Sequence, residues 1–75
     1  MNEQPYTVEC HWDAEAGVWY VAHTDIPGLA TEAATLEELQ NKLLRMIPEL
    51  LELNGSVERG QQVPFKLIAH ECAVA

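Results

Sequence analysis

Residues 6–24, YTVECHWDAEAGVWYVAHT, decide the fold that this sequence predicts. The first part of the stretch alternates apolar with polar side chains, which is the period-two pattern of a half-buried strand. Residues 18–24 are rich in β-branched and aromatic side chains, which favour strands. Between them, DAEAG begins with Asp13 and ends with Gly17, and both residue types are common in turns. The stretch therefore predicts a β-hairpin with strands over 6–12 and 18–24.

The two faces of this hairpin depend on its register, because a slip of one residue moves every side chain to the other face. Pairing Trp12 with Val18 would place His11 opposite Trp19, on the face that a helix would leave uncovered. An exposed patch that contains tryptophan usually marks an interface. The alternative places Trp19 in the core and Trp12 near its rim. The sequence pattern alone leaves both alternatives open.

After the hairpin, the sequence DIPGL over residues 25–29 predicts a tight reversal of the chain. Pro27 fixes its own φ, and Gly28 permits the positive φ that a type II turn requires. A short third strand over 29–33 then returns beside the second strand, although alanine is a poor strand former. The first 33 residues thus predict an antiparallel meander of three strands.

The helix that follows has a recognisable start, face and end. Thr35 is the expected N-cap, and Glu38 completes a capping box. Pro48 should bend the helix because it lacks an N–H group, and Gly55 should stop it one turn later, at about residue 53. The expected apolar face consists of Leu36, Leu39, Leu43, Ile47 and Leu50, with Leu44, Met46 and Leu51 widening it.

The last part of the chain completes the fold. Residues 56–62 form a polar connection that we expect to be flexible, as we do for residues 1–4. Residues 63–72 alternate again and predict a fourth strand, which a right-handed crossover through the helix would lay parallel to the first. The expected fold class is α+β, of order β-β-β-α-β, with a mainly antiparallel sheet and one helix packed on one face. Residues 1–75 should form one domain.

The formal net charge of −8 is distributed unevenly along the chain. All four basic residues follow residue 41, where four acidic residues balance them, so the net charge comes from the first 41 residues. Such a surface repels phosphate backbones, because nucleic-acid binding depends on Lys and Arg. We therefore expect no direct nucleic-acid binding, and a basic protein as the complementary partner. No apolar segment is long enough to cross a membrane and no export signal is evident, so a cytoplasmic location is expected.

The sequence predicts no catalytic, cofactor-binding or metal site. Asp13 and Asp25 lie at opposite ends of the second strand, so one Mg²⁺ ion could not gather them. The histidines and cysteines lack the spacings of zinc sites, and Cys10 and Cys72 are expected to be free thiols. Ser56, the sole serine, has no evident base to activate it. We therefore expect a protein that is not an enzyme and has no cofactor.

Several of these motifs together resemble the N-terminal domain of HicB antitoxins, and most closely its short stand-alone members. The resemblance extends over about residues 6–55 and rests on GVWYVA (17–22), DIPGL (25–29), TE (31–32), TLEEL (35–39) and LLELNG (50–55). It implies a partial ribonuclease-H-like fold without that enzyme's active site. It also implies binding to HicA toxins, which are small basic RNA-cleaving proteins. HicB antitoxins commonly carry a C-terminal DNA-binding domain, which we do not expect in these 75 residues.

The leading hypothesis is a non-enzymatic, antitoxin-like module that binds a basic HicA-like protein. A chain this short buries little apolar surface, so a homodimer is expected as well. The alternative is a small-ligand or metal-binding domain that uses the open face of the sheet. The residues expected to form the partner interface are Glu9, His11, Trp19, Val21, His23, Asp25 and Glu32.

Overall fold

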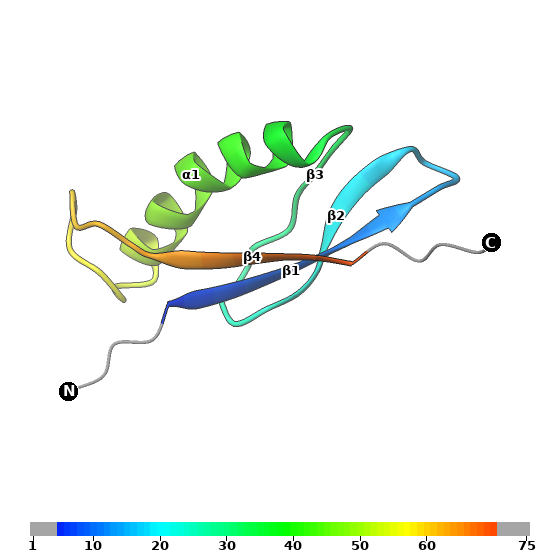
Figure 1. Cartoon of the computed structure of the whole chain (residues 1–75). Coiled ribbons are helices and arrows are strands. Elements are labelled where there is room, and N and C mark those ends of the chain that lie inside the picture. Colours follow the sequence, from blue (N-terminus) through cyan, green and yellow to red (C-terminus); the bar gives the residue numbers. More distant parts are fainter. Residues whose placement is uncertain (1–4, 71–75) are drawn as a thin grey trace.

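The computed structural model describes residues 5–70, and within them it has one helix and one four-stranded sheet. The elements are β1 (Tyr6–Asp13), β2 (Val18–Thr24), β3 (Glu32–Ala33), α1 (Leu36–Leu53) and β4 (Phe65–His70). The strand order in the sheet is β3-β2-β1-β4, and α1 lies along one face (Figure 1). The expected α+β class and the expected order of elements are confirmed.

The sheet is mixed, as the sequence predicts. β2 pairs antiparallel with both β1 and β3, whereas β4 lies parallel to β1. The 18 residues of α1 span about 27 Å at 1.5 Å per residue. The helix connects β3, at one edge of the sheet, to β4, at the other edge. Among the described residues, no helix combines the length and the apolar character that crossing a membrane requires.

Capping residues define both ends of α1. The hydroxyl oxygen of Thr35 accepts a hydrogen bond from the backbone N–H of Glu38 at 3.1 Å, so Thr35 is the N-cap. The helix continues through Pro48 as a single element. It stops before Gly55, where a φ of 72° turns the chain out of the helical conformation. The sequence therefore predicted the limits of α1 correctly.

The reversal between β2 and β3 is a tight turn around Gly28. Gly28 has a φ of 79°, and the backbone N–H of Leu29 donates to the carbonyl of Ile26 at 3.3 Å. This turn directs the side chains of Ile26 and Leu29 into the core. The third strand is therefore shorter than the expected 29–33: it comprises residues 32 and 33 alone, because Leu29 is packed inside rather than paired at the sheet edge.

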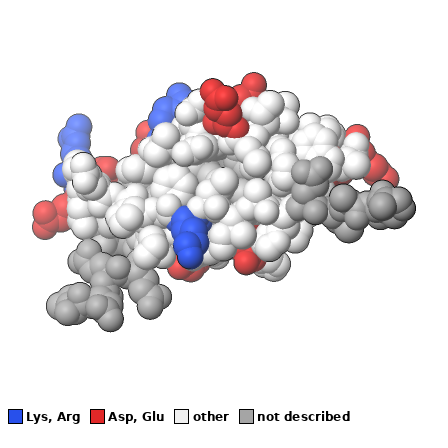
Figure 2. All heavy atoms as spheres, viewed as in Figure 1, with Lys and Arg blue, Asp and Glu red and all other residues white. Residues whose placement is uncertain are grey.

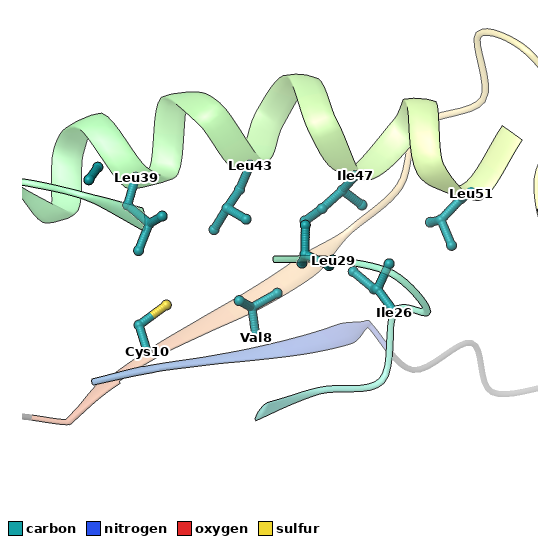
Figure 3. Packing of buried hydrophobic residues seen from close by; sticks show 9 residues of the cluster. Val8, Cys10, Ile26, Leu29, Leu39, Leu43, Ile47 and Leu51 are labelled. Atoms are coloured by element: carbon teal, nitrogen blue, oxygen red, sulfur yellow. The ribbon is translucent and has the colours of Figure 1, made fainter. Parts of the chain in front are cut away.

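The core lies between α1 and the sheet (Figure 3). α1 contributes every fourth residue, since side chains four apart lie on one face of a helix. Leu51 rather than Leu50 is fully buried, and Leu44, expected at the margin of the apolar face, is 54% exposed. Within residues 5–70, the nine buried residues are Val8, Cys10, Ile26, Leu29, Ala33, Leu39, Leu43, Ile47 and Leu51.

The register of the hairpin differs from the predicted pairing of Trp12 with Val18. Trp12 pairs instead with Trp19, and Asp13 pairs with Val18. The loop is one residue shorter than expected, and the backbone N–H of Gly17 closes it by donating to the carbonyl of Asp13 at 2.7 Å. The expected placement of Trp19 on the open face is therefore wrong. The alternative is confirmed, because Trp19 packs against the core and Trp12 is partly exposed beside it.

A β-bulge is the second difference from the predicted pairing. Between Glu9 and Cys10 of β1 the register shifts, so that Ala22 of β2 has no partner on β1. Val21 pairs with Cys10 and packs against the core, whereas His23 pairs with Glu9. Residues 21 and 23 would share a face in a regular strand, and the bulge separates them. The expected placement of Val21 on the open face is therefore wrong, and that of His23 is correct.

β4 begins two residues later than the expected 63–72. The carbonyl of Pro64 accepts a hydrogen bond from the backbone N–H of Tyr6 at 3.2 Å, but a proline has no N–H with which to continue the ladder. The expected strand residues 71 and 72, the thiol of Cys72 and the expected flexibility of residues 1–4 lie outside the described residues.

Candidate functional site

The face of the sheet opposite α1 is the candidate functional site. No helix of residues 5–70 covers this open face (Figure 1). Its side chains come from three neighbouring strands, because β1 lies between β2 and β4. At its centre lie five residues that we call the open-face cluster: Glu9, His11, Tyr20, His23 and His70.

His11 is the central member of the open-face cluster. Its ring centroid lies 5.1 Å from that of His70, 6.1 Å from that of Tyr20 and 6.4 Å from that of His23. Tyr20 is 39% exposed, so part of its ring is free to contact another molecule. Tyrosine and histidine each combine an apolar ring with polar atoms, which suits a surface that is wet in isolation and covered in a complex.

A contact between a histidine and a glutamate links β4 to the central strand β1 on this face. The Nε2 atom of His70 lies 3.9 Å from the Oε1 atom of Glu9, and both side chains are partly exposed. An exposed pair at this distance contributes about 1 kcal/mol or less to stability. The contact between His70 and Glu9 therefore contributes little to holding β4 against β1.

Asp25 lies at the margin of the open face. Its Oδ1 atom accepts a hydrogen bond from the backbone N–H of Thr7 at 2.9 Å, which ties the end of β2 to the start of β1. Glu32 pairs with Tyr20 across β2 and β3 and so shares its face. A shallow hollow of about 260 Å³ adjoins the cluster and is lined by Thr7, Glu9, His23, Thr24 and Asp25.

Four of the residues expected at the partner interface, namely Glu9, His11, His23 and Glu32, thus lie on the open face. The sequence reading missed Tyr20 and His70. The parallel pairing of the first and last strands was predicted correctly. From this pairing, the position of His70 beside His11 could have been predicted as well. Tyr20 was missed because its face depends on the length of the hairpin loop, which the sequence left ambiguous.

The His, Cys, Asp and Glu side chains determine whether this region could hold a metal ion or a reactive thiol. No group of three or more His, Cys, Asp or Glu side chains within residues 5–70 is arranged to hold a metal ion. Cys10 lies on the opposite face of the sheet, and burial raises the pKa of its thiol because the thiolate would lose its hydration. A reactive cysteine needs the opposite shift. Cys10 therefore acts as a small apolar side chain of the core.

The acidic side chains behind the net charge are spread over the molecule. Figure 2 shows them at several separate places rather than in a single patch. Glu9 and Glu32 lie on the open face, Asp13 is the last residue of β1, and Glu37 lies in the first turn of α1. A cationic partner would consequently meet negative charge at more than one side of the sheet.

Comparison with known proteins places this fold in a family. The chain is similar to the hypothetical protein TTHA1013 from the extremely thermophilic bacterium Thermus thermophilus, whose crystal structure is known. The two share 48% sequence identity over 92% of this chain and 96% of that one, with a TM-score of 0.63. A search of curated proteins found no match. Residues 5–75 match the domain of unknown function DUF1902, and the chain therefore belongs to the DUF1902 family.

Proposed function

We propose that this protein is a non-enzymatic, HicB-like protein-binding module of the cytoplasm, which uses the open face of its sheet to bind a small basic protein. The observation that supports the proposal is the uncovered open-face cluster, in which an exposed tyrosine lies beside three imidazoles. Tyrosine is enriched among the residues that dominate binding energy at protein interfaces.

The charge of the chain favours a basic partner. A net charge of −8 on 75 residues attracts a cationic protein from a distance and repels RNA and DNA. The resemblance to HicB antitoxins points to a HicA-type RNA-cleaving toxin as that partner. The same resemblance implies that the fold is a partial ribonuclease-H-like fold. Neutralisation would then consist of covering the toxin rather than of any chemistry by this chain.

Co-expression tests the proposal. A tagged, basic HicA-type toxin produced with this chain should co-purify with it, and the growth arrest that the toxin causes should be relieved. Tyr20→Ser should weaken both effects, because it removes the exposed ring from the open face. Leu44→Ser is the matched control, since Leu44 is also exposed but lies on α1, on the other side of the sheet. Absence of both co-purification and growth recovery would contradict the proposal.

The same module is expected to form a homodimer, because 75 residues enclose a small core. Sedimentation equilibrium between about 1 and 100 μM would test this expectation by covering the range of a typical non-obligate dimer. A monomeric mass throughout would contradict the homodimer while leaving the toxin-binding proposal to its own test.

One observation favours the small-ligand or metal-binding alternative. The rings of His11 and His70 are 5.1 Å apart, which two imidazoles on one zinc ion could match at Zn–N distances of about 2.1 Å. Two imidazoles alone would form a weak and open site. Titration with Zn²⁺ should then shift the NMR signals of both rings, and His11→Gln should abolish the shift. Unchanged signals at stoichiometric zinc would rule this alternative out.

A further inference from the structure

The two tryptophans of the chain lie together at one end of the molecule, away from the open face. Their ring centroids are 5.6 Å apart and their ring planes are inclined by 55°. Beside them is an open notch of about 310 Å³, lined by Trp12, Trp19, Ala34, Thr35 and Leu36. We call it the tryptophan notch.

The notch exists because the tip of the hairpin lies beyond the start of the helix that covers the sheet. Figure 1 shows the tip of the β1–β2 hairpin extending past the first turn of α1. Trp19 on β2 packs against the edge of the core, whereas Trp12 on β1 is 38% exposed. The β3–α1 connection contributes Ala34 and Thr35 to the lining, and both side chains are small compared with an indole ring. Part of the Trp12 ring is thus left free.

The charges around the notch are negative. Glu37 and Glu38 follow Leu36 in the first turn of α1. The side chain of Asp13 alternates with that of Trp12 along β1 and therefore lies on the other face of the sheet. The start of a helix carries about half a positive charge, which these two glutamates outweigh. Among residues 5–70 no Lys or Arg lines the notch, and Lys42, the basic residue nearest to Leu36 in the sequence, donates to the carbonyl of Glu32 at 2.6 Å. The notch therefore disfavours an anion.

We propose that the tryptophan notch binds an arginine side chain of a basic protein partner. A guanidinium group is flat and weakly hydrated, and it stacks on the face of an indole ring, where the cation is attracted by the electrons of the ring. Glu37 and Glu38, in the helical turn that begins at the notch, complement its charge. A flat cation thus matches both the shape of the site and its potential, whereas an aliphatic side chain would use only the apolar surface.

This inference is separate from the function proposed for the open face. The notch lies on the helix side of the sheet, so loss of one surface leaves the other intact. Trp12 and Tyr20 form a matched pair for testing this, because they have nearly equal exposures, 38% and 39%, on opposite sides of the sheet. Trp12→Leu should impair the notch alone, and Tyr20→Leu should impair the open face alone.

Tryptophan fluorescence provides a direct measurement, because both tryptophans of the chain line the notch. Titration with a tetra-arginine peptide should change the emission with a saturable curve. A tetra-glutamate peptide should produce no saturable change, and tetra-lysine should bind more weakly because an ammonium group cannot stack as a plane. Raising the salt to about 0.5 M should weaken arginine binding, since Glu37 and Glu38 are exposed and their charges are screened by salt.

Variants then locate the site. Measured by calorimetry, Trp12→Leu should weaken tetra-arginine binding by about tenfold, as expected for loss of a cation–π contact. Tyr20→Leu should leave the affinity unchanged. The Glu37→Gln, Glu38→Gln double variant keeps the tryptophans and should weaken binding at low salt but not at high salt. Circular dichroism confirms in each case that the fold persists.

Three results would overturn the inference. The first is a fluorescence response to tetra-arginine that fails to saturate at millimolar concentration. The second is an equal response to tetra-glutamate. The third is an affinity that Trp12→Leu leaves unchanged or that Tyr20→Leu reduces as much. Each of these outcomes would show that the peptide is held elsewhere or by net charge alone.

Discussion

The two faces of the same sheet differ in how closely folding constrains them. Along β1, Val8 and Cys10 are fully buried against α1, while Glu9 and His11, which alternate with them, lie on the open face. The covered face must be apolar, because burial of apolar surface stabilises the fold. The open face has no such requirement, yet it holds three imidazoles and an exposed tyrosine. The covered face therefore explains the stability of the molecule, and the open face is where selection for binding can act.

The largest difference between buried and exposed positions should appear at two adjacent leucines of α1. Leu43 is fully buried and Leu44 is 54% exposed. Leu43→Ala should lower the free energy of unfolding by about 2–5 kcal/mol, because it removes apolar contacts and leaves a cavity. Leu44→Ala should change it by about 0.5 kcal/mol or less. Urea unfolding followed by circular dichroism measures both, and similar losses would contradict the burial of α1 described above.

A smaller effect is expected at the turn that carries Ile26 and Leu29 into the core. Gly28 has a φ of 79°, and a Cβ atom placed there would lie 3.9 Å from the Cδ2 atom of Leu50, an ordinary contact. Gly28→Ala should therefore cost about 1–2 kcal/mol through its backbone conformation alone. Gly28→Asn should cost less, since asparagine tolerates this region better. Equal losses in urea unfolding would argue against the left-handed backbone.

The comparison between the faces also explains which features the sequence could predict. The limits of α1 follow from local chemistry, because Thr35 caps its start and Gly55 supplies a left-handed stop. The parallel placement of β4 follows from the handedness of crossovers. These features need no knowledge of distant contacts, so the pattern of residues was sufficient.

The faces of β2 could not be predicted in the same way. Asp13 is suited equally to ending a strand and to beginning a turn. The predicted register was wrong by one residue for this reason, and it placed Trp19 on the wrong face. The bulge at Ala22 depends on side chains of both strands packing at once, and it has no local signature. The open-face cluster was therefore predicted in part, through Glu9, His11 and His23, and Tyr20 and His70 were added only when the register was known.

The next effect concerns the first turn of α1. Thr35→Ala should cost about 1 kcal/mol in the free energy of unfolding, because the backbone N–H of Glu38 would lose its side-chain acceptor. Thr35→Ser keeps a hydroxyl group and should be nearly neutral. The measurement is again urea unfolding. A loss of equal size in both variants would indicate that the threonine methyl group, rather than the cap, stabilises this end.

The stability of the protein should fall at high pH because of the Cys10 thiol on the covered face. Burial raises the pKa of the Cys10 thiol, so the folded protein holds this proton more tightly than the unfolded chain. The resulting stabilisation is complete below the ordinary thiol pKa and is lost as the pH rises through the pKa of the folded protein. Urea unfolding at pH 7 and pH 10 measures this loss in a Cys72→Ser variant. Between the two pH values, the free energy of unfolding should fall more in this variant than in one that also carries Cys10→Ala. Equal losses would contradict the raised pKa.

The smallest expected effect on stability is at the open face, and it sharpens the contrast most. Tyr20→Ser should change the free energy of unfolding by about 0.5 kcal/mol or less, because the ring is 39% exposed and packs beside His11 rather than in the core. Thermal and urea unfolding should therefore hardly distinguish this variant from the parent chain, while co-purification with a basic partner should fall. A loss of stability as large as that of Leu43→Ala would show that Tyr20 supports the fold. The open face would then need no binding partner to explain its aromatic residue.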